Sequence, residues 1–276
     1  MPDAGAGDPE NDECHQFGNP GHSFDRCVHD DIVSPVLFAK QGGDVDAIDP
    51  KDVRQGRLGD CALLACVAGL SATPAGRALL RNAVVANTDE RGQVTSFTVT
   101  LHERRTQWLG PPTFRAVRVT VAAPYVVGHA NPRLGDRGER EIWPVVVEKA
   151  YAQLRGGYDT IDRGELPADA LSVLTGRDAS FVRLGLIGRL LPRYGTPDLG
   201  ADLAAGKVVV LSTPPGLDKN AFHLEPKHAY YAIGITDVGG KPCVRLGNPW
   251  GSESPTPVPC DQLATWFSGV SVGSVP

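Results

Sequence analysis

The sequence lacks the features of a membrane protein, a nucleic-acid-binding protein or a disulfide scaffold. No apolar run approaches the roughly 20 residues of a membrane-spanning helix, so we expect no membrane partner. Six cysteines in 276 residues are too few for a fold stapled by disulfides. The chain has no EF-hand loop pattern and no internal repeat. The net charge is −5, and the chain shows no cluster of basic residues of the size that nucleic-acid binding requires. We therefore expect no nucleic-acid partner.

The acidity is concentrated in residues 1–31, which we interpret as an acidic linker or tail. This segment holds eight acidic residues and one arginine, is rich in Asp, Gly and Pro, and shows no periodicity. It also contains the residue types that bind zinc: Cys14, His15, His22, Cys27 and His29. Their spacing matches no standard zinc finger, and a Cys14–Cys27 disulfide is a further alternative, so a solvated tail is favoured.

The stretch from Gln55 to Leu70 predicts a glycine-bearing turn that leads into an apolar helix. Every residue from Cys61 to Leu70 is small or aliphatic, which is typical of a helix buried nearly all round. Cys61 therefore stands in the first turn, among unpaired backbone N–H groups and at the positive end of the helix dipole. Both features favour the thiolate, which is the nucleophilic form of cysteine.

Gln55, six residues before Cys61, could add a side-chain N–H to the backbone N–H of Cys61 and form a two-donor oxyanion hole. The alternative is that Cys61 is only a small buried hydrophobe, as most free cysteines are. The choice depends on whether the chain also supplies a base and a group that orients it.

Two later segments supply such groups. His228 stands at the mouth of a β-rich run, and Asn248 follows 20 residues later at the end of the next expected strand. That separation suits adjacent strands of one hairpin. A His–Asn hydrogen bond would fix the imidazole tautomer, and Trp250 would shield the bond from water. His223 is a rival base, but it lies in a loop rather than at a strand, so we favour His228.

Periodicity and turn residues predict an α+β chain. Expected helices span residues 61–70, 75–82, 139–155 and 167–174, and expected strands lie near residues 97–101, 117–121, 207–212, 230–236 and 242–246. Gly239 and Gly240 predict a hairpin turn between the last two strands.

Four motifs together resemble the protease core of the calpain family. The motifs lie at Gln55–Ala65, Glu141–Tyr158, His228–Tyr230 and Asn248–Gly251. The resemblance runs from about residue 35 to about residue 272. It implies a two-lobed papain-like fold, with a helical lobe over residues 32–178 that carries the nucleophile and a β-rich lobe over residues 179–276 that carries the His and Asn. The cathepsin signature around its cysteine is absent.

The resemblance also implies a role for each site residue. Cys61 would be the nucleophile, His228 the base, Asn248 its orienter and Gln55 an oxyanion donor. Gly59 and Trp250 would border the substrate. Ala62 stands where calpains usually carry a tryptophan, so the fit of a substrate beside the scissile bond is expected to differ.

Calcium is possible at one site, although the chemistry requires no cofactor. Asp52 and Asp159 align with two acids of the first calcium site in calcium-dependent calpains. Calcium takes roughly six to eight oxygen ligands, and two carboxylates leave most of these to backbone and water. The alternatives are a helix or turn cap at Asp52 and a surface acid at Asp159. Because the acid-rich segment that follows the asparagine motif in calcium-activated members is missing, we do not expect a calcium switch.

These features predict a calpain-like cysteine endopeptidase that cleaves protein substrates through an acyl-enzyme on Cys61. One alternative is a papain-like glutamine deamidase or acyl transferase, and another is a non-catalytic interaction module that keeps the fold. Twenty of the 27 basic residues are arginine, and Ala and Gly are abundant, which indicates a GC-rich bacterial genome. We therefore expect a bacterial effector or toxin module, secreted or delivered into a target cell, with an immunity or inhibitor protein as a partner.

Overall fold

The structure is a computed structural model that describes residues 35–107, 110–122, 130–135, 138–184, 194–217, 222–251 and 254–276. The expected tail over residues 1–31, with its Cys and His set, lies outside the described residues. The helices are α2 (Cys61–Ser71), α3 (Pro74–Ala83), α4 (Trp143–Arg155), α5 (Tyr158–Ile161), α6 (Pro167–Thr175), α7 (Thr196–Ala204) and α8 (Leu263–Trp266), with 3-10 turns η2 (Pro50–Asp52) and η4 (Cys260–Gln262).

The described strands form three sheets. A small sheet has the order β1-β6-β5 and contains β1 (Pro35–Val36), β5 (Arg133–Leu134) and β6 (Arg140–Glu141). An antiparallel sheet has the order β2-β3-β4 and contains β2 (Val84–Thr88), β3 (Val94–Arg105) and β4 (Thr113–Ala122). The largest sheet has the order β11-β10-β9-β8-β12-β7 and contains β7 (Ser180–Arg183), β8 (Val208–Ser212), β9 (Ala229–Val238), β10 (Lys241–Gly247), β11 (Val258–Pro259) and β12 (Gly269–Gly273).

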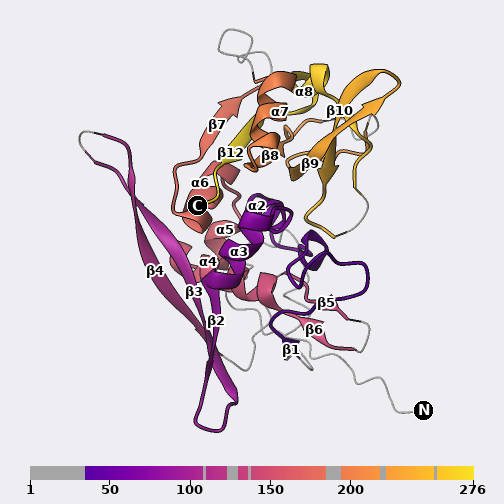
Figure 1. Cartoon of the computed structure of the whole chain (residues 1–276). Helices are drawn as coiled ribbons and strands as arrows, with labels where there is room; N and C mark the ends of the chain where they lie inside the picture. The colour runs from indigo at the N-terminus through magenta and orange to yellow at the C-terminus, as the bar shows by residue number, and fades with distance from the viewer. Residues whose placement is uncertain are drawn as a thin grey trace.

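Helix α2 lies at the centre of the molecule, between the helices of the first half and the six-stranded sheet (Figure 1). All its residues after Cys61 are buried, which confirms the prediction of a helix enclosed nearly all round. The helix packs closely on the sheet at Gly69, where an added Cβ would lie 2.6 Å from Val208 Cγ1. Helix α2 is therefore fixed on both sides, and only its first turn reaches the surface.

Local signals in the sequence explain where several elements begin and end. Thr73 caps α3 by accepting a hydrogen bond from the backbone N–H of Gly76, and Pro74 occupies its first turn. Gly176 ends α6 in the left-handed conformation, with φ of 67°. Gly239 and Gly240 also have positive φ, and they join β9 to β10 in the predicted hairpin.

The fold differs from the sequence-based expectation in several parts, which include the unpredicted strands β2 and β7. The helix expected from residue 139 begins only at Trp143, because Arg140 and Glu141 pair with Pro35 and Val36 in the small sheet. Strand β12 was not predicted, although it lies between β8 and β7 in the large sheet. Its sequence, Gly269–Gly273, has only two apolar side chains among glycine and serine, which gives a weak strand signal.

Two apolar clusters form the core. One surrounds α2, α4 and α6 and includes the inward face of β3, and the other fills the space between the six-stranded sheet, α7 and α8. Within the part of the chain that the structure describes, no single helix is long and apolar enough to cross a membrane. The pair α2 and α3 meets that criterion only together, and the two are bent by 114°.

Candidate active site

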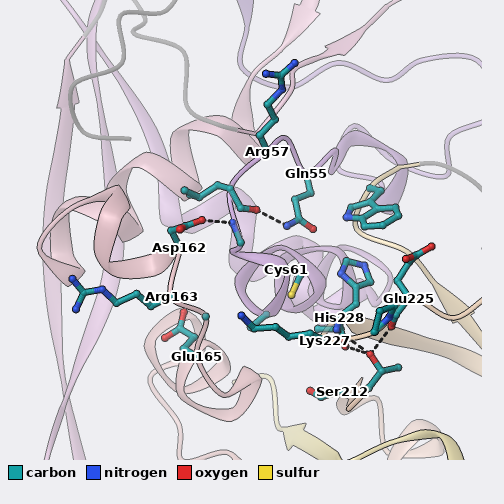
Figure 2. A pocket seen from close by; sticks show the side chains of 18 of the residues that line it. Gln55, Arg57, Cys61, Asp162, Arg163, Glu165, Ser212, Glu225, Lys227 and His228 are labelled. Carbon is teal, nitrogen blue, oxygen red and sulfur yellow. Dashed lines mark hydrogen bonds between the residues drawn. The ribbon is translucent and has the colours of Figure 1, made fainter. Parts of the chain in front are cut away.

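A cleft of about 730 Å³ opens at the first turn of α2. One wall comes from residues 55–59 and 162–166, and the other from residues 212–213, 225–229 and Trp250. Cys61 lies between the two walls (Figure 2). The cleft therefore brings segments almost 200 residues apart in the sequence to one nucleophilic side chain.

Cys61 is a free, half-buried thiol at the first position of α2. Burial raises its pKa to about 11, and the nearby charge of Asp60 adds to this effect. Backbone hydrogen bonds from Ala229 and Ala62 lower the pKa but do not offset burial. The sequence predicted a resting thiolate, whereas the structure favours the neutral thiol. The loss of hydration raises the pKa of Cys61 by more than the start of the helix lowers it.

His228 is oriented by Asn248, as the sequence predicted for the pair. Its Nε2 lies 3.0 Å from Asn248 Oδ1, and the same oxygen accepts a hydrogen bond of 3.1 Å from the backbone N–H of Trp250. Because the Trp250 N–H can only donate, the Asn248 atom that meets both groups is the carbonyl oxygen. His228 must then carry its proton on Nε2, which leaves the lone pair on Nδ1 free to accept a proton.

The surroundings of His228 keep it neutral and fixed in position. Burial lowers the pKa of His228, while its bond to Asn248 and the charge of Glu225 act in the opposite direction. Its ring packs against Trp250 with the centroids 4.7 Å apart, and against Tyr230 at 4.8 Å. The backbone N–H of His228 also donates to Thr213 Oγ1 at 2.9 Å, which ties the base to the end of β8.

Gln55, which the sequence predicted to be an oxyanion donor, lines the cleft. Its Nε2 donates one hydrogen bond of 2.7 Å to the carbonyl oxygen of Leu58 (Figure 2). This bond sets the orientation of the amide, and the second N–H on the same nitrogen remains available to a ligand in the cleft. The backbone N–H of Gln55 donates to the carbonyl oxygen of Pro249 at 2.7 Å.

Gly59 is held by Asp162, a residue that the sequence analysis missed. The backbone N–H of Gly59 donates to Asp162 Oδ1 at 2.8 Å (Figure 2). A Cβ on Gly59 would lie 2.6 Å from the carbonyl oxygen of Asp162, so only glycine fits there. Asp162 stands 103 residues after Gly59, so no local sequence pattern could predict this contact.

Asp60 and Glu148 form a buried carboxyl pair behind the nucleophile. Asp60 is 2% exposed and Glu148 is fully buried. Burial raises the pKa of Asp60 to about 7, and a hydrogen bond with Glu148 opposes this rise. Burial of both carboxyl groups disfavours their charged forms.

His223, the rival base, is exposed and is not among the residues that line the cleft. Its backbone is in the left-handed region, with φ of 56°. The side-chain oxygen of Asn248 contacts His228 and the backbone N–H of Trp250 instead. The structure therefore brings together Cys61, His228, Asn248 and Gln55, as predicted from their motifs.

The carboxylate of Asp52 has protein partners on both oxygens. Oδ1 accepts from Arg133 Nη1 at 2.7 Å, and Oδ2 accepts from Trp143 Nε1 at 3.1 Å and from the backbone N–H of Asp49 at 2.7 Å. The same Arg133 nitrogen contacts Asp44 at 2.9 Å. Arg133 therefore already pairs with the carboxylates of both Asp44 and Asp52.

Asp159 lies in the first turn of α5, half-buried. No group of three or more His, Cys, Asp or Glu side chains that could hold a metal ion occurs among the described residues. Calcium binding at Asp52 and Asp159 stays a prediction, and no step below depends on it.

Comparison with known proteins agrees with the site geometry. The model of the calpain family cysteine proteases matches residues 37–270. Rat calpain-13 is 30% identical over 217 residues, which cover 73% of this chain and 29% of the rat protein. The calpain-type cysteine protease DEK1 of Arabidopsis thaliana is 30% identical over 232 residues, which cover 79% of this chain and 10% of the plant protein.

Calpain-9 of Homo sapiens is 27% identical over 218 residues, or 72% of this chain and 28% of the human protein. The chain thus spans less than a third of the length of these relatives. The family match nevertheless covers every element that lines the cleft. With its α+β, papain-like architecture, this chain belongs to the calpain family of cysteine proteases.

Proposed function

We propose that this chain is a cysteine endopeptidase that hydrolyses peptide bonds in protein substrates. The observation that carries the proposal is the His228–Asn248 hydrogen bond of 3.0 Å, in the same cleft as Cys61. This bond leaves Nδ1 of His228 as the basic nitrogen. A neutral thiol and a neutral base in one cleft can react by coupled proton transfer and attack.

In the proposed reaction the proton of Cys61 Sγ passes to His228 Nδ1 as sulfur attacks the carbonyl carbon. The oxygen of the tetrahedral intermediate takes up negative charge, which the Cys61 backbone N–H and the second Gln55 N–H stabilise. His228 then gives its proton to the leaving amine, and the C–N bond breaks to leave a thioester. Water attacks the thioester with His228 as the base and frees the thiol.

The experiment combines an active-site electrophile with a defined, unfolded protein substrate. Wild type and Cys61→Ala are incubated with the substrate, and both substrate and enzyme are examined by intact-mass analysis. We expect fragments with wild type alone, and a single electrophile adduct on Cys61 that blocks them. An intact substrate with a deamidation mass shift would replace hydrolysis with glutamine deamidation. Absence of both the adduct and any change in substrate would contradict an enzyme.

We further propose that the protein acts as a bacterial effector or toxin, with an immunity or inhibitor protein bound over the cleft. This proposal is based on the amino-acid composition, because 20 of the 27 basic residues are arginine, as is typical of proteins from GC-rich bacterial genomes. Expression of wild type and Cys61→Ala in target cells tests it. Toxicity that requires Cys61 is expected, and equal toxicity of both proteins would contradict it.

A further inference from the structure

Lys227 occupies an unusual position beside the catalytic base. It directly precedes His228, and its backbone is in the left-handed region with φ of 51°. Such a conformation is uncommon for a residue other than glycine and marks a position held by its surroundings. The backbone N–H of Lys227 donates to the carbonyl oxygen of Pro214 at 3.1 Å, which holds the loop against the end of β8.

The side chain of Lys227 points into the cleft rather than away from it. It is exposed, lines the cleft, and extends beneath Cys61 toward the wall that carries Arg163 and Glu165 (Figure 2). Its charge acts on the Cys61 thiol and lowers the pKa of that group. The side chain of Lys227 therefore enters the same cleft as the sulfur of Cys61.

The acidic residues of the cleft already have partners. Asp162 accepts the backbone N–H of Gly59 at 2.8 Å. Glu165 accepts from Tyr151 Oη at 2.7 Å and from Arg155 Nη2 at 3.3 Å. Glu225 also has a polar partner.

Two cations that line the cleft, Lys227 and Arg163, differ from these acids. Lys227 and Arg163 form no ion pair within the described ranges of the chain. An ammonium group without a counter-ion attracts an anionic group of a ligand that enters beside it. The free charge next to Cys61 is therefore positive.

We propose that Lys227 is a specificity-determining residue that selects substrates with an Asp or Glu side chain within two residues of the scissile bond. A lysine side chain spans about the same distance as two residues of extended peptide, each of which advances roughly 3.3 Å. An acidic side chain bound there replaces water around Lys227 with a charge-assisted hydrogen bond. This inference rests on the proposed peptidase function, because it assigns the substrate class of the same cleft.

The test uses peptide electrophiles that label Cys61 without requiring turnover. Matched probes differ only in carrying Glu or Gln at one position, and the ratio of their labelling rates is measured. Wild type is expected to favour the Glu probe by roughly tenfold, as for a hydrogen bond to a charged group. Iodoacetamide, which carries no charge, corrects each variant for the general reactivity of Cys61.

Variants separate the charge of Lys227 from its backbone role. Asparagine tolerates the left-handed region, so Lys227→Asn is expected to keep the loop but lower the Glu-to-Gln ratio to about one. Lys227→Arg should keep the preference, and Lys227→Glu should favour the Gln probe over the Glu probe. Lys241→Asn, in the exposed hairpin between β9 and β10, is the matched control and should behave as wild type.

The outcomes separate this inference from the proposed function. Efficient labelling with no preference for Glu, or a preference that survives Lys227→Asn, would overturn the role of Lys227 and leave the peptidase proposal intact. Failure of every peptide probe to label Cys61 while iodoacetamide succeeds would overturn both.

Discussion

The backbone N–H of Gln55 donates a hydrogen bond of 2.7 Å to the carbonyl oxygen of Pro249. This contact joins the turn that carries the nucleophile to the loop that carries Asn248. Asn248 in turn fixes His228 at 3.0 Å. The turn before Cys61 and the loop of Asn248 are thus tied by a main-chain bond that no side-chain substitution can remove directly.

Removal of the Gln55 side chain is predicted to lower kcat by roughly 100- to 1000-fold, the usual cost of one oxyanion donor. Gln55→Ala should leave the folded state intact, because the backbone bond to Pro249 remains. Gln55→Glu is the isosteric control and should be at least as slow, since a carboxylate repels the oxyanion. Steady-state kinetics with a peptide substrate measure both, and unchanged kcat in Gln55→Ala would exclude this residue from the oxyanion hole.

The base and its orienter should differ in the size of their effects. His228→Ala is predicted to reduce kcat/KM by roughly 100- to 10,000-fold, the range of general acid–base catalysis. Asn248→Ala should cost less, because His228 keeps its contacts with Thr213, Tyr230 and Trp250. A larger loss from Asn248→Ala than from His228→Ala would contradict these roles.

The pH dependence of thiol reactivity follows from the two pKa directions. The pKa of Cys61 is raised to about 11 and that of His228 is lowered, so both groups are neutral around pH 7. Alkylation of Cys61 by iodoacetamide should then rise about tenfold per pH unit between about pH 7 and pH 10, with the thiolate fraction. The fall of kcat/KM at acid pH should occur below the ordinary pKa range of histidine, because the lowered pKa of His228 means that the base is protonated only at lower pH. A flat alkylation rate from about pH 5 to pH 8 would instead show a thiolate–imidazolium pair at rest.

Asp162 is predicted to stabilise the turn that carries Cys61. Asp162→Ala leaves the N–H of Gly59 without its 2.8 Å acceptor and should lower the free energy of unfolding by about 1–3 kcal/mol. Asp162→Asn keeps an acceptor oxygen and should cost less. Denaturant unfolding of the three proteins checks this, and equal stability of all three would show that water replaces the carboxylate.

Arg133 should contribute more to stability than any exposed arginine. Arg133→Gln leaves the buried carboxylate of Asp52 without its cation, while Asp44 keeps only Lys51, and should lower the free energy of unfolding by about 3–5 kcal/mol. Arg104→Gln, which breaks an exposed pair with Asp178, is the control and should cost at most about 1 kcal/mol. Similar unfolding midpoints for the two variants would contradict the buried ion pair.

The sequence was sufficient to predict those parts of the site that have a local motif. The apolar run after Cys61, the strand mouth at His228 and the Asn–Pro–Trp turn each carry their own signal, and their contacts agree with it. Contacts across the chain were not predictable. The acceptor for Gly59 is 103 residues away, and Arg133 meets Asp52 81 residues away.

The ionisation state of Cys61 could not be predicted from the sequence either. The helix terminus is visible in the residues, but the burial that raises the thiol pKa comes from the packing of β9 against α2. The left-handed backbone of Lys227 likewise depends on its bond to Pro214. Strand β12 gains its place from its neighbours β7 and β8 rather than from its own propensity.

The most direct test of the central claim is mass spectrometry of newly formed protein N-termini in a cell lysate treated with wild type or Cys61→Ala. The samples are run in parallel with calcium and with chelator. We predict new termini with wild type in both conditions and none with Cys61→Ala. Termini that persist in Cys61→Ala, or a wild-type sample without any, would contradict a peptidase built on Cys61, His228 and Asn248.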